Sequence, residues 1–367
     1  IKGEPTVVLV DFSSLIPRKD EILKSLWESY HVDSISGQWD YIEPVLFGWA
    51  AGVVIASYVE TFGTPTEKAV AHFHEWMTAA GGLYLRKHAP YIATVFTTHA
   101  TVMGRCIAGN RLPLYNDLPK FNADELARQF NVTAKHSIEK MAAAYHDAFL
   151  TVSDITANEC KYLLGREPDG VTPNGFENDF VWAGEEYYAK RDEARRAMIS
   201  VAEACLGEKF TGDPLIVGTS GRYEFRNKGI DVFIESLKQL AASDRLRREV
   251  LAYITVPAGN RGPRLDLQAH LADPSKPIDA GQYRHSTHYL ENATWDPIVN
   301  ALKNSNLTDP GSKVKGIFVP TYLNKADGIF HKDYYELLVG MDITVFPSYY
   351  EPWGYTCLLY TSPSPRD

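Results

Sequence analysis

Four short segments of this sequence combine residue types that could bind or activate a ligand. Each follows a segment that we expect to form a strand, and α/β proteins bind ligands at the carboxyl ends of their strands. Two segments fall in the first half of the chain and two in the second, so we expect a ligand held between two domains. The four segments are His72–Trp76, Phe96–Thr101, Ser220–Gly229 and Tyr349–Thr356.

Arg222 and Lys228 form a cationic pair around a glycine-containing turn that leads into an expected helix. The amino terminus of a helix already favours anions. An arginine fork and a lysine charge could stabilise a departing diphosphate without a metal ion. Taken alone, the two residues fit an ordinary surface turn equally well.

Glu351 precedes Pro352 and Gly354, which fix a tight backbone path that could bring amide groups against a ligand. Its carboxylate could accept hydrogen bonds from sugar hydroxyls. From this residue alone, a glutamate that caps the next helix is the simpler interpretation.

His72 and His74 alternate along an expected strand and therefore share one face, whereas Glu75 does not. No H-E-x-x-H spacing occurs, so we favour His74 as a hydrogen-bonding group at a strand end over a metal ligand. We expect His99 to be a structural histidine. The sequence also lacks the phosphate-binding loop, the nucleophile elbow and the dinucleotide fingerprint, which disfavours kinases, hydrolases and dehydrogenases.

The elements that must position these residues are strands alternating with helices, which predicts an α/β fold with mostly parallel sheets. The chain has 367 residues, of which 45% are hydrophobic, enough for two domains. Ile230, Phe233, Leu237 and Leu240 recur at helical spacing after the Arg222 turn. The expected strands are 7–10, 69–73, 92–96, 148–152, 170–172, 215–219, 250–256, 315–319 and 343–346.

We expect the chain to divide into a first domain at 1–205, a linker at 206–214 and a second domain at 215–356. The polar stretch 261–312 is interpreted as an insertion with one helix near 296–302. The last residues, 357–367, contain Pro363 and Pro365, which would stop the helix due there. We interpret them as a translated sequencing adapter.

Composition narrows the function classes. The net charge of −9 and the dispersed cations disfavour binding to nucleic acid. No uninterrupted apolar run reaches the roughly 18 to 20 residues that span a bilayer, which disfavours a membrane protein. The four cysteines are far apart and form no C-x-x-C pair, which indicates a reducing compartment.

Several motifs resemble the eukaryotic-like glycogen synthase family. They include Gly-Arg-Tyr-Glu-Phe from Gly221 followed by Asn-Lys-Gly from Asn227, and Tyr-Tyr-Glu-Pro-Trp-Gly-Tyr-Thr from Tyr349. The resemblance also extends through 72–83, 94–105 and 152–175, and from Asp296 to Thr356.

This resemblance implies a GT-B architecture, with two Rossmann-like domains facing across a cleft. It implies a cytoplasmic enzyme that transfers glucose from UDP-glucose to the 4-hydroxyl of a growing α-1,4-glucan with retention of configuration, leaving UDP. No metal or other cofactor is implied, because UDP-glucose is a co-substrate. Whether the chain forms a homo-oligomer is left open.

The resemblance also implies residue roles. Arg222 and Lys228 match the pair at the donor diphosphate, and Glu351 matches the first glutamate of the family motif, near the donor glucose. Tyr334 matches the tyrosine that stacks on uracil. Positions matching those around the glucose and phosphates, or facing the sugar from the first domain, are Trp353, Gly354, Tyr355, Thr356, His74 and Asn174.

Two departures from the family pattern affect the expected activity. Leu359 stands where the family has a second glutamate, and the family's amino-terminal glycine-rich loop is not in this sequence. We therefore expect the 367-residue chain itself to be inactive. The alternatives are another GT-B glycosyltransferase with a different nucleotide-sugar donor, and a non-catalytic glucan-binding protein.

Overall fold

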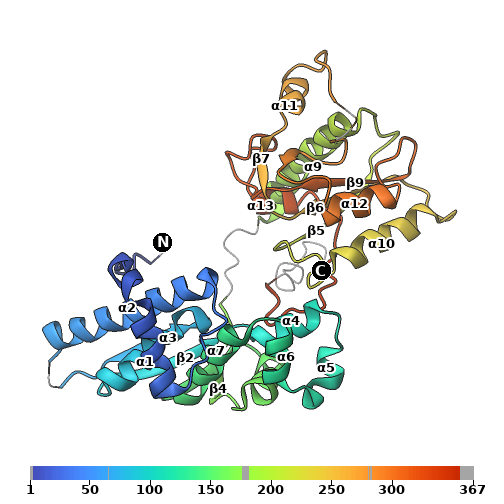
Figure 1. The fold of residues 1–367 in the computed structure, drawn as a ribbon. Helices are drawn as coiled ribbons and strands as arrows, with labels where there is room; N and C mark the ends of the chain where they lie inside the picture. Colours follow the sequence, from blue (N-terminus) through green and yellow to red (C-terminus); the bar gives the residue numbers. More distant parts are fainter. Residues whose placement is uncertain (1–2, 65, 176–181, 280, 282, 356–367) are drawn as a thin grey trace. The chain divides into compact units, whose positions relative to one another are not determined.

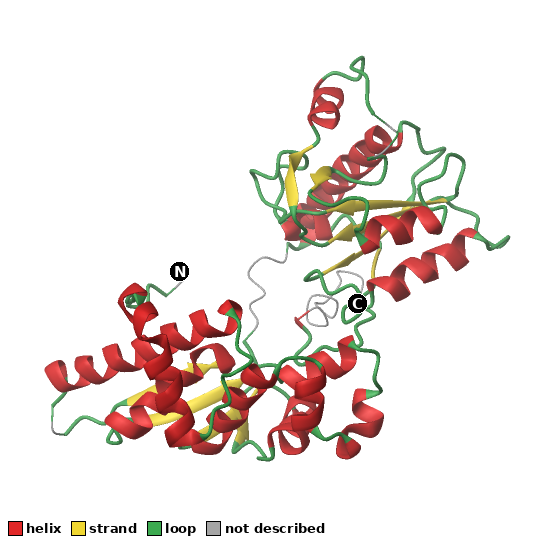
Figure 2. Ribbon diagram, in the orientation of Figure 1, coloured by secondary structure: helices red, strands yellow, loops and turns green. Residues whose placement is uncertain are grey.

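The structure, a computed structural model, describes residues 3–64, 66–175, 182–279, 281 and 283–355. It divides into two compact units, Ile1–Gly175 and Phe176–Asp367 (Figure 1). In each unit, helices pack around a sheet (Figure 2). The predicted α/β class with parallel sheets is confirmed in both.

The sheet of the first unit has four parallel strands in the order β1-β2-β3-β4. They match four of the segments predicted from apolar runs. At the centre, Phe96 and Phe149 are fully buried and stack with ring centroids 5.8 Å apart. The strands are β1 (Val70–His74), β2 (Ala93–Thr98), β3 (Ala148–Thr151) and β4 (Gly170–Val171).

Helices and short helical turns surround this sheet. They are η1 (Ser13–Arg18), α1 (Lys19–Tyr30), α2 (Trp39–Phe62), α3 (Glu75–His88), α4 (Val102–Gly109), α5 (Leu114–Asp117), η2 (Leu118–Lys120), α6 (Ala123–Gln129), α7 (Thr133–Tyr145), α8 (Asp154–Glu159) and the π-helical η3 (Cys160–Leu164).

The α2 helix is long and apolar enough by composition to cross a membrane, which the sequence analysis did not anticipate. One of its faces packs closely on α3. A Cβ added at Gly52 would lie 2.7 Å from the carbonyl oxygen of Gly81, so the two backbones almost touch. Its buried residues, among them Val45 and Leu46, belong to the core of the first unit. This packing accounts for the apolar residues on one face of α2, whereas Val54 and Tyr58 elsewhere on the helix are exposed.

The second unit has a four-stranded parallel sheet in the order β10-β5-β6-β9. Strands β6 and β9 are buried along their whole length, as expected for central strands covered on both faces. The strands are β5 (Leu215–Ser220), β6 (Val250–Thr255), β9 (Val314–Val319) and β10 (Ile343–Thr344), and the helices are α9 (Gly184–Leu206), α10 (Ile230–Ala241), α11 (Leu265–Ala272), α12 (Pro297–Asn304) and α13 (Tyr334–Leu338).

Helix α9 belongs to the second unit, so the division lies earlier than the predicted boundary at 206–214. Arg191 and Arg195 on α9 both bind the carboxylate of Asp342, at 2.5 and 2.8 Å. The hydroxyl of Tyr253 on β6 donates to the carbonyl of Met198 on α9, at 2.6 Å. The helix therefore covers one face of the second sheet, although it precedes the strands of that sheet in sequence.

Two other predictions differ from the structure. Residues 7–10 form no strand, and Leu9 is 93% exposed. The stretch 261–312 contains more structure than predicted: helix α11, and an antiparallel pair of β7 (Asn260–Pro263) with β8 (His288–Leu290). The fully buried Arg264 holds this stretch together, because its guanidinium donates hydrogen bonds to main-chain carbonyls of the same stretch, including those of Asp279 and Tyr283.

Candidate functional site

The candidate site of the second unit begins where β5 ends, at Ser220. The chain continues through Gly221 and turns into α10 at Gly229, whose φ of +63° lies in the left-handed region. A Cβ at Gly229 would lie 1.8 Å from the carbonyl oxygen of Pro347. Glycine is therefore required both by the backbone conformation and by the close approach of the loop that follows β10.

Hydrogen bonds join these two loops. The amides of Tyr349 and Tyr350 both donate to the carbonyl of Asn227, at 2.9 and 3.2 Å. The guanidinium of Arg226 lies over the ring of Tyr349, 3.4 Å from its centroid, which adds a cation–π contact. Two of the segments identified in the sequence thus form one surface at the carboxyl end of the second sheet.

Lys228 and Glu351 meet on this surface. The Nζ of Lys228 donates to Oε2 of Glu351 at 2.5 Å, and the hydroxyl of Ser348 donates to the same oxygen at 3.3 Å. Both side chains are largely withdrawn from solvent, with 12% of Lys228 and 25% of Glu351 exposed. The ion pair lies beside the amino terminus of α10, where an anion would also be favoured.

Arg222, on the loop after β5, and Tyr334, the first residue of α13, differ in how firmly they are held. Arg222 is 65% exposed and contacts Glu224 at 3.3 Å, so its guanidinium can reach a ligand from solvent. The hydroxyl of Tyr334, at the start of α13, is 2.6 Å from that of Ser220. Burial raises the pKa of Tyr334, so the phenol stays neutral. The sequence analysis assigned no role to Ser220, which orients Tyr334.

Three further predicted residues follow Glu351. Gly354 has a φ of +83°, and the rings of Trp353 and Tyr355 are 6.5 Å apart. The indole nitrogen of Trp353 is buried without a hydrogen-bond partner among the described residues. Thr356, Leu359 and the segment interpreted as an adapter lie outside the described residues.

The candidate site of the first unit contains three imidazoles. His72 and His74 share a face of β1, as predicted, with ring centroids 4.1 Å apart. The Nδ1 of His74 is 2.9 Å from Nε2 of His99, which follows β2, and Asn174 hydrogen-bonds His99. The sequence analysis expected His99 to be structural, whereas it lies with the two predicted residues His74 and Asn174.

Electrostatics keep His99 neutral. Burial lowers the pKa of His99, the neighbouring His74 lowers it further, and the hydrogen bond to Asn174 opposes both effects. A neutral imidazole can donate one hydrogen bond and accept another, which suits the recognition of hydroxyl groups.

Glu75 joins β1 to α3 and supports the histidines. Its φ of +65° is unusual for a residue other than glycine, and its Oε1 accepts a hydrogen bond from the amide of His99 at 2.9 Å. Strained conformations of this kind concentrate at functional sites. Glu75 is thus a contributor that the sequence analysis considered only as a metal ligand, and the described residues contain no group of three potential metal ligands.

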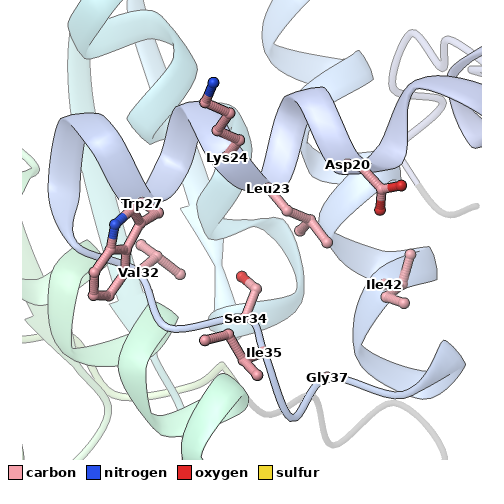
Figure 3. Close-up of a pocket in the computed structure, with 9 residues that line it drawn as sticks. All are labelled: Asp20, Leu23, Lys24, Trp27, Val32, Ser34, Ile35, Gly37 and Ile42. Atoms are coloured by element: carbon pink, nitrogen blue, oxygen red, sulfur yellow. The ribbon is translucent and has the colours of Figure 1, made fainter.

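Several hollows in the described parts of the chain lie apart from the predicted residues, and two of them include an exposed tryptophan. One, of about 440 Å³, lies between α1 and the segment leading to α2 (Figure 3). There the apolar side chains include Trp27 and Ile35, while the amino group of Lys24 points away from the connecting segment (Figure 3). The other, of about 230 Å³, lies in the second unit and includes Tyr223 and the exposed Trp295.

The chain is thus a two-unit α/β protein whose chemically distinctive residues cluster at the carboxyl ends of parallel strands. It belongs to the glycogen synthase family, whose sequence model matches residues 1–266 and 284–363. The unmatched residues between these ranges fall within the stretch interpreted as an insertion.

Curated relatives agree with this assignment. The chain is 30% identical to glycogen [starch] synthase of Neurospora crassa, a match that covers 97% of this chain and 58% of the relative. It is 29% identical to glycogen [starch] synthase isoform 2 of Saccharomyces cerevisiae, over 97% of this chain and 59% of that relative. It is 28% identical to the liver glycogen [starch] synthase of Rattus norvegicus, over 97% of this chain and 58% of that relative. The chain therefore spans somewhat more than half the length of these relatives.

Among solved structures, the chain is similar to the catalytic domain of starch synthase IV from Arabidopsis thaliana, which was solved bound to ADP and acarbose. The match covers 86% of this chain and 58% of the starch synthase chain. The sequence identity is 14% and the TM-score is 0.47. The fold assignment therefore rests on the chain's own two sheets.

Proposed function

We propose that the protein to which this chain belongs is a cytoplasmic glycogen synthase. It transfers glucose from UDP-glucose to the 4-hydroxyl of an α-1,4-glucan, with retention of configuration. The observation that carries this proposal is the meeting of Lys228 and Glu351, with Arg222 on the same loop, at the carboxyl end of the second sheet. Membership of the glycogen synthase family supports the choice of substrates.

In this reaction, the bond between the glucose anomeric carbon and the diphosphate oxygen breaks, and negative charge grows on the diphosphate. Arg222 and Lys228 stabilise that charge electrostatically, together with the amino terminus of α10. Glu351 orients Lys228 and accepts hydrogen bonds from the donor glucose. No metal ion or other cofactor takes part in this proposal.

The remaining residues have binding roles. Tyr334, fixed by Ser220, stacks on the uracil, and the segment from Trp353 to Thr356 surrounds the glucose and phosphates. In the first unit, His74 and Asn174 donate and accept hydrogen bonds to sugar hydroxyls, with His99 between them. The two Rossmann-like units form a GT-B enzyme in this proposal.

The test is a glucosyl-transfer assay on glycogen, with UDP-glucose and ADP-glucose, using the product of the complete reading frame. Turnover that prefers UDP-glucose supports the proposal, and a preference for ADP-glucose indicates a different glycosyltransferase. Glucan binding without turnover from either donor indicates a binding protein. For the 367-residue chain itself we expect no glucan-dependent release of UDP, because Leu359 stands where the resemblance places the second glutamate of the family motif.

A further inference from the structure

A carboxyl group lies in the interior of the first unit, where the proposed reaction does not use it. Glu139 on α7 has no exposed surface. One of its oxygens, Oε1, is 2.8 Å from the hydroxyl of Thr98, and Oε2 accepts a hydrogen bond from the amide of Val102 at 2.9 Å. Thr98 is the last residue of β2 and Val102 is the first residue of α4, so the two partners border the loop that carries His99.

Charged groups of both signs lie around Glu139. The lysines of its own helix, Lys135 and Lys140, are paired with Asp40 and Asp124. Among the described residues, no cation forms an ion pair with Glu139 itself. The acidic groups and thiols near it on neighbouring elements are Glu75 of α3, Glu159 of α8, Cys106 of α4 and Cys160 of η3, and the cation Arg105 of α4 also acts on Cys106.

This environment favours the protonated form. Burial raises the pKa of Glu139 to about 8, and the carboxylates of Glu75 and Glu159 add to the shift. The hydrogen bonds from Val102 and Thr98 oppose the rise without cancelling it. A buried carboxyl with no cationic partner commonly holds a proton at neutral pH for this reason.

The protonation state of Glu139 determines which hydrogen bonds the hydroxyl of Thr98 can make. Its oxygen is 2.8 Å from Glu139 and 3.3 Å from the carbonyl oxygen of Ala100, but it has one proton to donate. If Glu139 is ionised, Thr98 must donate to it, and the Ala100 carbonyl loses this donor. If Glu139 is protonated, Glu139 donates to Thr98 and Thr98 donates to Ala100, so both contacts are hydrogen bonds.

We propose that Glu139 is a positioning residue that stays protonated at neutral pH and, through Thr98 and Val102, fixes the loop that carries His99. Two other carboxyl groups hold the same loop. Glu75 accepts from the amide of His99 at 2.9 Å, and Glu159 accepts from the hydroxyl of Thr101 at 2.6 Å. The proton on Glu139 allows three carboxyl groups to converge on one short segment without three negative charges.

The inference concerns the protonation of Glu139 and holds whether or not His99 contacts a sugar. It is tested on the 367-residue chain by hydrogen exchange of the amides at 99–104, corrected for the intrinsic effect of pH. When the loop opens, Glu139 becomes exposed to water and its pKa returns to the ordinary value of a glutamate. At any pH between that value and its pKa in the closed loop, opening therefore releases a proton. Wild-type protection should therefore fall about tenfold per pH unit between pH 5 and 8, and level off above pH 8.

Three variants separate the proton from the side chain. Glu139→Gln supplies a permanent donor to Thr98 and an acceptor to Val102, so protection should remain high and independent of pH. Glu139→Ala supplies neither, so protection should be low at every pH. The exposed Glu125→Gln on α6 is the control and should reproduce the wild-type profile.

A wild-type profile that runs parallel to that of Glu139→Gln would overturn the proposal, as would a glutamine variant as poorly protected as Glu139→Ala. If the glutamine variant does not fold, infrared titration of the wild-type chain decides. We expect the carbonyl band of a protonated carboxyl group at pH 7, disappearing near pH 8. A wild-type chain without any such band at pH 7 would also overturn the proposal.

Discussion

Lys228 and Glu351 form an ion pair of 2.5 Å between residues that are 123 positions apart in sequence. The pair exists because the carbonyl of Asn227 receives the amides of Tyr349 and Tyr350, which fixes the two loops against each other. The positive charge of Lys228 is therefore already balanced before any anion arrives. A bound diphosphate must share this lysine with Glu351, whereas Arg222 is accessible from solvent.

The first prediction concerns Arg222. Because its side chain is exposed, Arg222→Ala should change the free energy of unfolding by less than about 0.5 kcal/mol. Glucosyl transfer by the complete protein should nevertheless fall about 100-fold or more, since one charge that stabilises the leaving diphosphate is lost. Arg245→Ala, at another exposed arginine, is the control for both measurements. Equal transfer rates for wild type and Arg222→Ala would remove Arg222 from the site.

The second prediction concerns Gly229. In Gly229→Ala, the added methyl group would meet the carbonyl of Pro347 in a backbone conformation that disfavours alanine. We expect this variant to lose about 2 kcal/mol or more of stability in denaturant unfolding of the second unit, and to bind UDP more weakly. Gly212→Ala is the matched control, because nothing lies within 4 Å of its added Cβ. Similar midpoints for the two variants would show that the loops can separate at little cost.

The third prediction concerns Arg264, which is fully buried and forms a bidentate pair with Asp266 at 3.1 and 2.6 Å. Arg264→Leu removes the cation and leaves several main-chain carbonyls without a donor. We expect a loss of about 3 to 5 kcal/mol in equilibrium unfolding. The exposed Arg247→Leu serves as the control and should be close to neutral. A small effect at Arg264 would mean that the stretch 261–312 contributes little to the stability of the second unit.

The fourth prediction concerns acid stability. Burial lowers the pKa of His285 to about 4, well below the value of about 6.5 in an unfolded chain. Above pH 6.5 the residue is neutral in both states, whereas between pH 6.5 and 4 the unfolded state alone takes up a proton. Stability should therefore fall by about 1.4 kcal/mol per pH unit across this window on account of His285.

The variant His285→Leu should remove that part of the slope when the unfolding free energy is measured from pH 7 to pH 4. His270→Leu, at a half-buried histidine of α11 whose Nδ1 contacts the carbonyl of Lys276, is the control. An unchanged slope in His285→Leu would show that His285 is protonated in the folded chain.

Apolar runs predicted the strands of both sheets well, because central parallel strands are buried on both faces and contain few polar residues. The same signal was wrong at residues 7–10, where the apolar side chains have no sheet to join. Helix α11 and the strand pair β7–β8 were missed because their stretch is polar. The buried Arg264 holds them together by pairing with Asp266 and by donating to main-chain carbonyls, and these carbonyl partners leave no trace in the sequence.

The candidate residues of the second unit were identifiable individually, and their resemblance to a family motif placed them together. Local spacing could not show that Lys228 binds Glu351, because the contact depends on how β5 and β10 pair in the sheet. Glu139 was missed for a different reason. A glutamate between two lysine-containing turns of a helix is typical of an exposed face, and only the tertiary packing shows that it is buried.

The membership of α9 in the second unit matters for anyone who wishes to dissect this protein. A recombinant fragment that starts at the predicted linker, residue 206, would discard the helix and expose Tyr253 and its apolar neighbours on one side of the sheet. A fragment that starts before Gly184 would retain that cover and both arginines that clasp Asp342. A first-unit fragment should end before this helix. If it were included there, its apolar face would be exposed without the second sheet to pack on, and we expect such a fragment to aggregate.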